Sequence, residues 1–173
     1  MVVPDDAVSG PILASVLRIE RVGFGHPDAL LLVEAVQEEY VARYGGRDDT
    51  PLDPLMFEPP SGSFFVGYLD DVPAVSGAWR RRGDVEAFGT TVTAEVKRMY
   101  VTRSARGRGL ARAMLAHLEA TAAQAGAEAM VLETGTAQPE AIALYESSGY
   151  TRIASFGHYQ WSPSNRCFAK PLT

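Results

Sequence analysis

Cysteine, histidine and long apolar runs are scarce in this chain, and each scarcity excludes a class of protein. Cys167 is the single cysteine, so no disulfide forms within the chain and no cysteine-based zinc site is possible. The three histidines do not lie at metal-ligand spacings, and we expect no metal. No apolar stretch is long enough to span a bilayer, and the N-terminus lacks the pattern of a signal peptide. We therefore expect a cytoplasmic protein with no membrane partner.

An excess of positive charge is also missing. The formal net charge is −5, which argues against general affinity for nucleic acid. The 173 residues fit one domain, and their apolar content of 46% is ordinary for a globular protein. We expect residues 1–14 to form a flexible N-terminal tail and residues 15–173 to form a single domain.

Turn residues and hydrophobic periodicity divide the chain into alternating elements. We expect strands at 15–24, 63–69, 73–81, 92–101, 129–135, 150–156 and 166–172. Helices are expected at 26–46, 107–126 and 138–149, with a loop and a short helical turn at 47–62. The buried stripe of the first helix is predicted to be Leu30, Val33, Ala35, Val36 and Tyr40. Antiparallel hairpins before a strand–helix–strand crossover predict an α/β (α+β) fold, with a mixed, mostly antiparallel sheet of about six to seven strands and helices on both faces.

The segment VKRMYVTRSARGRGLARAML (96–115) stands out because it combines a strand, a glycine loop and a helix start. The first backbone N–H groups of a helix have no internal partner and favour an anion. Gly107 and Gly109 allow backbone to approach such an anion closely. Arginines can add bidentate contacts, and four lie here: Arg103, Arg106, Arg108 and Arg112. We interpret the segment as a pyrophosphate cradle; the alternative is a solvated basic turn that caps a helix.

Two common nucleotide-binding motifs do not fit this segment. A P-loop ends in Gly-Lys-Ser/Thr, and the loop contains no such lysine or hydroxyl. The dinucleotide fingerprint requires a third glycine where Arg112 stands.

The segment resembles the acetyl-CoA motif of the GNAT superfamily of acyl-CoA-dependent N-acyltransferases. The family motif Gln/Arg-x-x-Gly-x-Gly/Ala appears as Arg106-Gly-Arg-Gly109-Leu-Ala111, directly after a strand that ends in RMYV. A second family signature, Asn-x-x-Ala-x-x-x-Tyr, is matched by Gln138-Pro-Glu-Ala141-Ile-Ala-Leu-Tyr145 and is followed by ESSGY. Both motifs occur in the order and separation of the family.

The resemblance implies a single N-acetyltransferase domain over residues 15–173, with two central strands that splay apart around acetyl-CoA. It assigns the pantetheine arm to Met99, Tyr100 and Val101. It assigns the cofactor's pyrophosphate to residues 106–112, and further cofactor contacts to the second signature: Arg106, Gly107, Arg108, Gly109, Leu110, Ala111, Arg112, Gln138 and Ala141. Family members often form homodimers, which the resemblance also allows here.

Acetyl transfer to an amine requires a base for the amine and an acid for the departing thiolate. The family resemblance places Tyr145 near the sulfur, as the general acid; the alternative is an aromatic that only packs its helix on the sheet. Glu95 is the predicted base, acting directly or through a water, because many family members keep a glutamate early on this strand. Its alternative is an exposed carboxylate paired with Lys97 or Arg98. Glu133, at the end of the next strand, is a second candidate.

Two further segments can contribute to an acceptor site. The loop FGHYQWSPSN (156–165) offers His158, Tyr159, Trp161 and Asn165, although an ordinary surface hairpin fits it equally well. The stretch WRRRGD (79–84) either binds an acidic acceptor or forms a solvated hairpin tip, which is the usual meaning of a charge run.

The sequence thus favours an enzyme that transfers an acetyl group from acetyl-CoA to a primary amine of a small molecule by direct attack. The alternatives are a protein or peptide N-acetyltransferase and a non-catalytic module that binds acyl-CoA. An RNA-binding role for ARGRGLAR is disfavoured, because the chain is acidic and no aromatics interleave with these arginines.

Overall fold

The computed structural model describes residues 15–172, so the tail expected at 1–14 lies outside the described residues. The elements follow one another as β1 (Leu17–Val22), α1 (Pro27–Tyr44), the 3-10 helix η1 (Pro54–Phe57), β2 (Gly62–Leu69), β3 (Val72–Arg82), β4 (Thr93–Val101), η2 (Arg103–Ala105), α2 (Leu110–Gln124), β5 (Ala129–Gly135), α3 (Pro139–Ser147), β6 (Thr151–Ile153) and β7 (Asn165–Pro171). Each strand and helix that the sequence predicts is present in this order.

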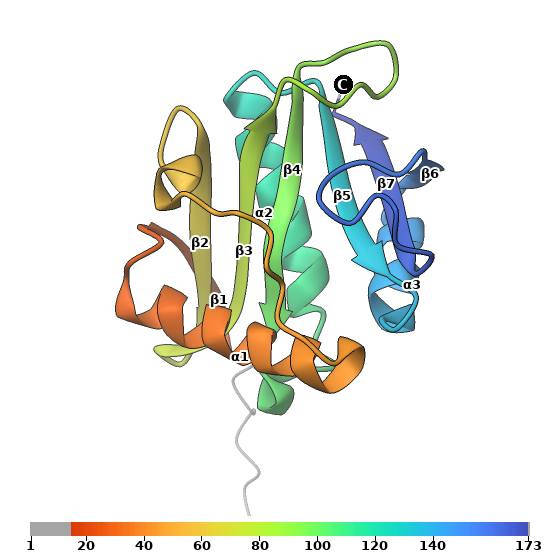
Figure 1. Ribbon diagram of the computed structural model, residues 1–173. Coiled ribbons are helices and arrows are strands. Elements are labelled where there is room, and N and C mark those ends of the chain that lie inside the picture. Colours follow the sequence, from red (N-terminus) through yellow and green to blue (C-terminus); the bar gives the residue numbers. More distant parts are fainter. Residues whose placement is uncertain (1–14, 173) are drawn as a thin grey trace, which may run out of the picture.

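The described strands form one seven-stranded sheet in the order β1-β2-β3-β4-β5-β7-β6. All neighbouring strands are antiparallel except β4 and β5, which are parallel. Helix α1 crosses one face of the sheet, and α2 and α3 cover the other (Figure 1). The predicted mixed, mostly antiparallel sheet with helices on both faces is therefore confirmed.

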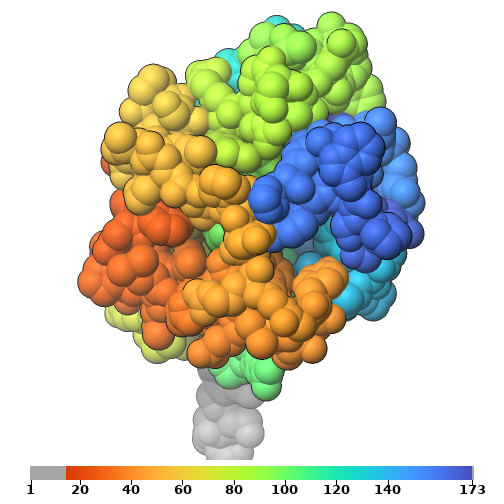
Figure 2. Space-filling view, viewed as in Figure 1, coloured from red at the N-terminus to blue at the C-terminus, as the bar shows by residue number. Residues whose placement is uncertain are grey.

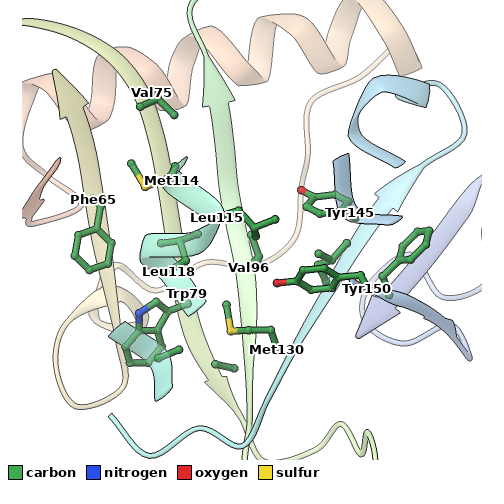
Figure 3. Packing of buried hydrophobic residues seen from close by; sticks show 14 of the residues in the cluster. Phe65, Val75, Trp79, Val96, Met114, Leu115, Leu118, Met130, Tyr145 and Tyr150 are labelled. Carbon is green, nitrogen blue, oxygen red and sulfur yellow. The ribbon is translucent and has the colours of Figure 1, made fainter. Parts of the chain in front are cut away.

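The larger hydrophobic core lies between the sheet and helices α2 and α3. Met114, Leu115 and Leu118 of α2 are buried there against β3, β4 and β5 (Figure 3). Strand β5 shows the alternation that a sheet covered on both faces requires: Met130 and Leu132 belong to this core, and the residues between and before them face the other side.

The opposite face is covered in two parts. Helix α1 and η1 bury an aromatic cluster that includes Phe57 and Phe64, which lie edge to face with centroids 5.9 Å apart. Beyond the end of α1 the covering consists of two loops, residues 47–53 and 156–164, which meet across the front of the molecule (Figure 2). The candidate site lies beneath these loops.

Three local expectations from the sequence were wrong. Leu30 is 47% exposed, whereas α1 buries Val36 as predicted together with Ala29 and Leu32; an apolar run such as ALLLVEAV fits more than one stripe, and only the sheet selects one. Helix α2 begins at Leu110, not at Gly107, because Gly109 has the left-handed φ of 77° and acts as the N-cap. Strand β6 is limited to three residues of the expected seven.

A bulge interrupts strand β4 opposite Gly77. The pairing of β3 with β4 shifts between Ser76 and Ala78, and Arg98 adopts a φ of 54°, a conformation that bulky residues rarely take. The bulge changes which side chains face α1: Glu95 and Lys97 do so before it, and Tyr100 does so after it. It therefore concentrates charged side chains at one point of the sheet.

Candidate active site

Strands β4 and β5 splay apart and open a cavity in the middle of the sheet. Their parallel pairing covers only Thr93–Glu95 against Ala129–Val131, and the strands then diverge (Figure 1). The cavity has a volume of ≈ 780 Å³ and extends from the start of α2 to the two covering loops. This confirms the predicted splayed central strands and places a binding site of ligand size between them.

One end of the cavity is built from the glycine loop and the start of α2. Gly107 and Gly109 have φ values of 79° and 77°, and a Cβ added at either would meet nothing within 4 Å. No side chain caps the helix among the described residues. The first amides of α2 therefore face open space next to the cavity, which is the arrangement that binds a phosphate oxygen.

The arginines of this loop are less free than the sequence suggests. Arg106 lines the cavity, but it donates to Glu39 (2.7 Å) and to the Val101 carbonyl (3.1 Å). Arg112 also lines the cavity and donates to two serine hydroxyls at the end of α3 (2.8 and 3.0 Å). Arg108 is exposed and does not line the cavity. Backbone amides rather than free guanidinium groups thus dominate this end.

The middle of the cavity lies along the unpaired edge of β4. Met99, Tyr100 and Val101 line it, as do Leu110 and Ala111 of α2. Beyond Glu95 no described residue of β4 pairs with β5, so the β4 backbone on that side can pair with an extended ligand.

Helix α3 closes the middle of the cavity from the other side. Gln138 and Ala141 line the cavity, and Gln138 donates to the Tyr44 hydroxyl of α1 (3.0 Å). The structure thus brings the defining positions of both sequence motifs to one cavity: Arg106, Gly109 and Ala111 of the first, and Gln138, Ala141 and Tyr145 of the second.

Tyr145 projects from α3 into the space between the splayed strands. Its ring is packed on Tyr150 and Phe168, with centroids 5.7 and 6.4 Å away, and its hydroxyl points toward β4 (Figure 3). The hydroxyl has no hydrogen-bond partner among the described residues, and the residue lines the cavity. Burial raises the pKa of Tyr145 above its usual value, so the phenol keeps its proton.

Glu133 lies at the opposite wall, near the end of β5. Its carboxylate lines the cavity, with Lys97 Nζ at 4.0 Å and the Asn165 amide at 3.4 Å. Burial raises the pKa of Glu133 above its usual value, although the charge of Lys97 opposes this shift. A carboxylate with a raised pKa beside a cavity is suited to accept a proton.

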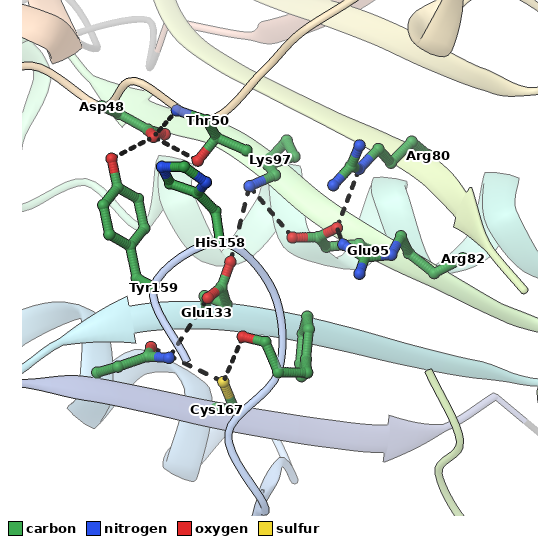
Figure 4. Close-up of polar contacts among 12 residues, drawn as sticks. Asp48, Thr50, Arg80, Arg82, Glu95, Lys97, Glu133, His158, Tyr159 and Cys167 are labelled. Carbon is green, nitrogen blue, oxygen red and sulfur yellow. Dashed lines mark hydrogen bonds and ion pairs between the residues drawn. The ribbon is translucent and has the colours of Figure 1, made fainter. Parts of the chain in front are cut away.

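Glu95 occupies a different environment from Glu133. Its side chain is fully buried and does not line the cavity. Its Oε2 accepts from Arg80 (3.0 Å) and Arg82 (2.6 Å), and its Oε1 lies 3.2 Å from Lys97 Nζ (Figure 4). Burial alone would raise the pKa of Glu95, but these three cations lower it. Of the two candidate bases, the geometry favours Glu133.

A buried ion pair that the sequence did not reveal holds the front loop on the sheet. Arg98, at the bulge, donates to Asp48 at 2.6 Å. Gln37 of α1 exchanges two hydrogen bonds with the Asp48 backbone, at 3.1 and 2.8 Å. Burial opposes ionisation of Asp48, but its bonds with Thr50 and Arg98 hold the pKa of Asp48 far below its usual range. The adjacent acidic residues of GRDDT were the one sequence signal for this anchor.

The two front loops are tied together over the cavity. The Tyr159 hydroxyl contacts both Asp48 (3.0 Å) and Asp49 (2.7 Å), and His158 Nε2 lies 2.9 Å from Asp49. Of the four loop residues considered from the sequence, Tyr159 and Asn165 line this cavity and His158 lines a second one, whereas Trp161 is 88% exposed. The loop is therefore a cover and not an independent surface hairpin.

Neither a metal-ligand cluster nor a membrane-spanning helix is found among residues 15–172. No three His, Cys, Asp or Glu side chains there cluster closely enough to hold a metal ion. None of the described helices combines the length and the hydropathy that a membrane crossing requires.

The chain that forms this cavity matches a known protein family. Residues 32–150 match the family model described as "Acetyltransferase (GNAT) family". An IAA acetyltransferase of Azospirillum brasilense is 38% identical over 99 residues, which are 54% of this chain and 65% of that relative. The chain thus spans slightly less than two thirds of that relative's length.

Solved structures extend the likeness to the whole described fold. A Klebsiella pneumoniae protein, an acyl-CoA N-acyltransferase by its description, superposes with a TM-score of 0.71 at 26% identity and covers 91% of this chain and 98% of its own. The Salmonella typhimurium protein yncA, whose structure holds acetyl-CoA, gives a TM-score of 0.66 at 17% identity, with 92% and 95% of the two chains covered. At that identity yncA shows the fold alone.

Proposed function

Because the chain belongs to the GNAT acetyltransferase family, we propose that it transfers an acetyl group from acetyl-CoA to the primary amine of a small molecule. The chain is an acyltransferase, and acetyl-CoA is the acyl donor of its family. The acceptor, the direct-attack mechanism, the extent of the domain over 15–173 and the roles of individual residues are parts of the proposal.

Two parts of the cavity support the proposal that acetyl-CoA binds there. The uncapped amides of α2 and the open glycine positions suit the pyrophosphate, with Arg106 and Arg112 at their rim. The unpaired edge of Met99–Val101 suits the amide-containing pantetheine arm, with Gln138 and Ala141 opposite. Arg108 remains in the proposal as a solvent-side cation that attracts the phosphates over a longer range.

Acetyl-CoA supplies an acyl thioester when bound. The Glu133 carboxylate accepts the proton that the amine nitrogen loses as the new C–N bond forms. The Tyr145 hydroxyl donates a proton to the sulfur as the C–S bond breaks; Glu133 then releases its proton to solvent, and solvent returns a proton to Tyr145. No cysteine lines the cavity among the described residues, so no cysteine thiol is placed there to form an acyl-enzyme, and direct attack needs none.

In this proposal Glu95 acts indirectly. Its negative charge holds Lys97 beside Glu133, so loss of Glu95 would move the ammonium group closer to Glu133 or release it. Of the two roles predicted for Glu95 as a base, direct or through a water, only the one through a water is compatible with a side chain that does not line the cavity.

The tie between the two front loops is the observation that favours a small acceptor. The bonds from Tyr159 to Asp48 and Asp49 close the front of the site, where a peptide substrate would need an open groove. The presence of both Tyr145 and Glu133 at the cavity argues against a module that only binds acyl-CoA. The predicted homodimer and the predicted cytoplasmic location stay predictions.

Release of free thiol from acetyl-CoA in the presence of amines tests this function. We expect release with small primary amines and not with peptides, and a drop of about 100-fold in kcat for Tyr145→Phe with unchanged acetyl-CoA affinity by calorimetry. Binding without release for every amine would support the non-catalytic module instead. Preferential release with peptides would support the protein acetyltransferase.

A further inference from the structure

A second cavity lies on the same face of the sheet as α1, beneath the two front loops. Its volume is ≈ 450 Å³, and its walls include Arg80, Arg82 and Asp84 of β3 and its turn, with Phe156, Gly157 and His158 of the later loop. Arg80 and Arg82 belong to the stretch WRRRGD, which the sequence left between a solvated tip and a binding site. Their side chains are only 13% and 11% exposed, so they are not a solvated tip.

The two arginines differ in how many of their donors are used. Arg82 bonds two carboxylates with all three of its nitrogens: it donates to Asp84 through Nε and Nη2 (both 2.8 Å) and to Glu95 through Nη1 (2.6 Å). Arg80 donates from Nε to Glu95 (3.0 Å) and from Nη1 to the sulfur of Met56, which is a weak acceptor. The remaining N–H groups of Arg80 have no acceptor among the described residues, although the side chain is nearly buried.

Positive side chains gather around this cavity, and carboxylates balance them in number. Arg80, Arg82 and Lys97 converge on the buried carboxylate of Glu95. Asp84 bonds Arg82 and is 70% exposed at the rim, and Glu133 lies 4.0 Å from Lys97. Arg80 contacts no carboxylate other than Glu95, so an oxyanion that enters the cavity would meet those of its N–H groups that have no acceptor among the described residues.

The second cavity adjoins the proposed base. Gly157, in its wall, lies so close to Glu133 that an added Cβ would be 2.7 Å from Oε2. The same Glu133 carboxylate lines the larger cavity. Arg80 and Glu133 are linked through Glu95 and Lys97 by contacts of 3.0, 3.2 and 4.0 Å (Figure 4). One molecule that reached both groups would thus present an anion to Arg80 and an amine to Glu133.

We propose that the second cavity binds a carboxylate of the acceptor, so that the substrate is an amino acid or a related small amine that carries a carboxylate. Arg80 holds the carboxylate with its free donors, Arg82 and Lys97 contribute positive charge, and Glu133 faces the amine. This inference rests on the proposed acetyl transfer and names the class of its acceptor.

Pairs of acceptors that differ only in this charge test the inference. The standard L-amino acids and linear ω-amino acids of increasing length are compared with their carboxamides, which keep the amine and lose the negative charge. We expect the free acids to give at least a tenfold higher kcat/KM than their amides, and Arg80→Gln to remove about that tenfold preference. The acetyl-CoA affinity of Arg80→Gln should stay unchanged.

Arg81→Gln is the matched control, since Arg81 lies on the same strand but donates to the Ala125 carbonyl at the end of α2 and to Pro60. It should keep the preference for acids. Arg80→Lys keeps the positive charge but loses the planar guanidinium group, and it controls for a folding defect in Arg80→Gln. This variant should retain part of the preference for free acids over carboxamides.

The failures of the two proposals are distinguishable. Amides acetylated as well as acids, or a preference that survives Arg80→Gln, would overturn the carboxylate site and leave the acetyltransferase function intact. Acetyl-CoA binding with no acetylation of any amine would overturn the proposed function, and with it the inference that depends on it.

Discussion

The two ends of the main cavity are built on opposite principles. At the end proposed for acetyl-CoA, residues 106–112 form a continuous loop and helix start that offer backbone amides. At the end proposed for the acceptor, Lys97, Glu133 and Tyr159 come from three separate segments; Lys97 lies 4.0 Å from Glu133, and Tyr159 bonds Asp48 and Asp49. One end is therefore built from a single stretch of sequence and mainly from backbone groups. The other is built from separate segments and contains several charged side chains.

This difference predicts how each end responds to substitution. Backbone amides survive most side-chain changes, so damage at the acetyl-CoA end should affect ligand binding and little else. Buried charges depend on each other, so a change at the acceptor end should affect catalysis or folding stability strongly. Substitutions at the two ends test this contrast.

Glu133→Gln removes the proposed base at the acceptor end without changing its shape. We expect kcat to fall by about 1,000-fold, because general base catalysis is lost, while acetyl-CoA affinity stays the same. In the parent, activity should decrease as the pH falls through a value above the ordinary pKa of glutamate, since burial raises the pKa of Glu133 and only the ionised form accepts a proton. This decrease in activity at low pH, the acidic limb of the pH profile, should be absent in the variant.

The exposed Glu128 provides the control, as Glu128→Gln removes a carboxylate just before the same strand. A full acidic limb in Glu133→Gln would show that another group, with Glu95 as the first candidate, is the base.

Asp48→Asn breaks the buried pair with Arg98. We expect the free energy of unfolding to fall by about 3 kcal/mol, because the Arg98 charge stays buried without its partner. Since the pKa of Asp48 is lowered in the folded protein, its ionisation stabilises the fold above the unfolded pKa, and this contribution is lost as the pH falls. Urea unfolding at neutral and acidic pH measures both effects.

The variant should therefore lose less stability in acid than the parent does. Asp71→Asn, which removes one partner of an ion pair whose aspartate is 91% exposed, should change stability very little. Equal losses of unfolding free energy in both variants would mean that the buried pair of Asp48 and Arg98 stabilises the fold no more than an exposed ion pair does.

Gly109→Asp places a negative charge at the start of α2 and is matched by Gly109→Asn. Both residues tolerate the left-handed φ of 77° and have the same shape, so they differ in charge alone. We expect acetyl-CoA affinity to be about tenfold weaker for the aspartate variant than for the asparagine variant, with similar stability. Calorimetric titration measures this; equal affinities would place the pyrophosphate elsewhere.

Features that depend on neighbouring residues were predicted from the sequence, and features that depend on tertiary packing were not. The glycine loop, the order of the elements and the convergence of both motifs on one cavity were predicted, because each depends on residues close together in the chain. The register of the stripe on α1 was wrong at Leu30, since its choice depends on the sheet beneath it.

Glu95 illustrates what neighbouring residues cannot reveal. The alternative to its role as a base was an exposed carboxylate paired with Lys97 or Arg98; in the structure Glu95 lies 3.2 Å from Lys97, but its side chain is buried. The second and third cations arrive from β3, across a register of Arg80 with Glu95 that no motif encodes. The link between Arg98 and Asp48 spans 50 positions and needs a bulge that reverses the side-chain alternation.

Hydrophobic periodicity, turn residues and helix-start amides act over short distances along the chain, so the elements, their order, the family motifs and the loop proposed to bind an anion could be predicted from the sequence alone. Tertiary structure alone decided which carboxylate faces the cavity, which arginine keeps free donors and how the front loops close. Those outcomes depend on burial and on the distances between charges, and both quantities exist only after β3, β4, β5 and the loops have packed together.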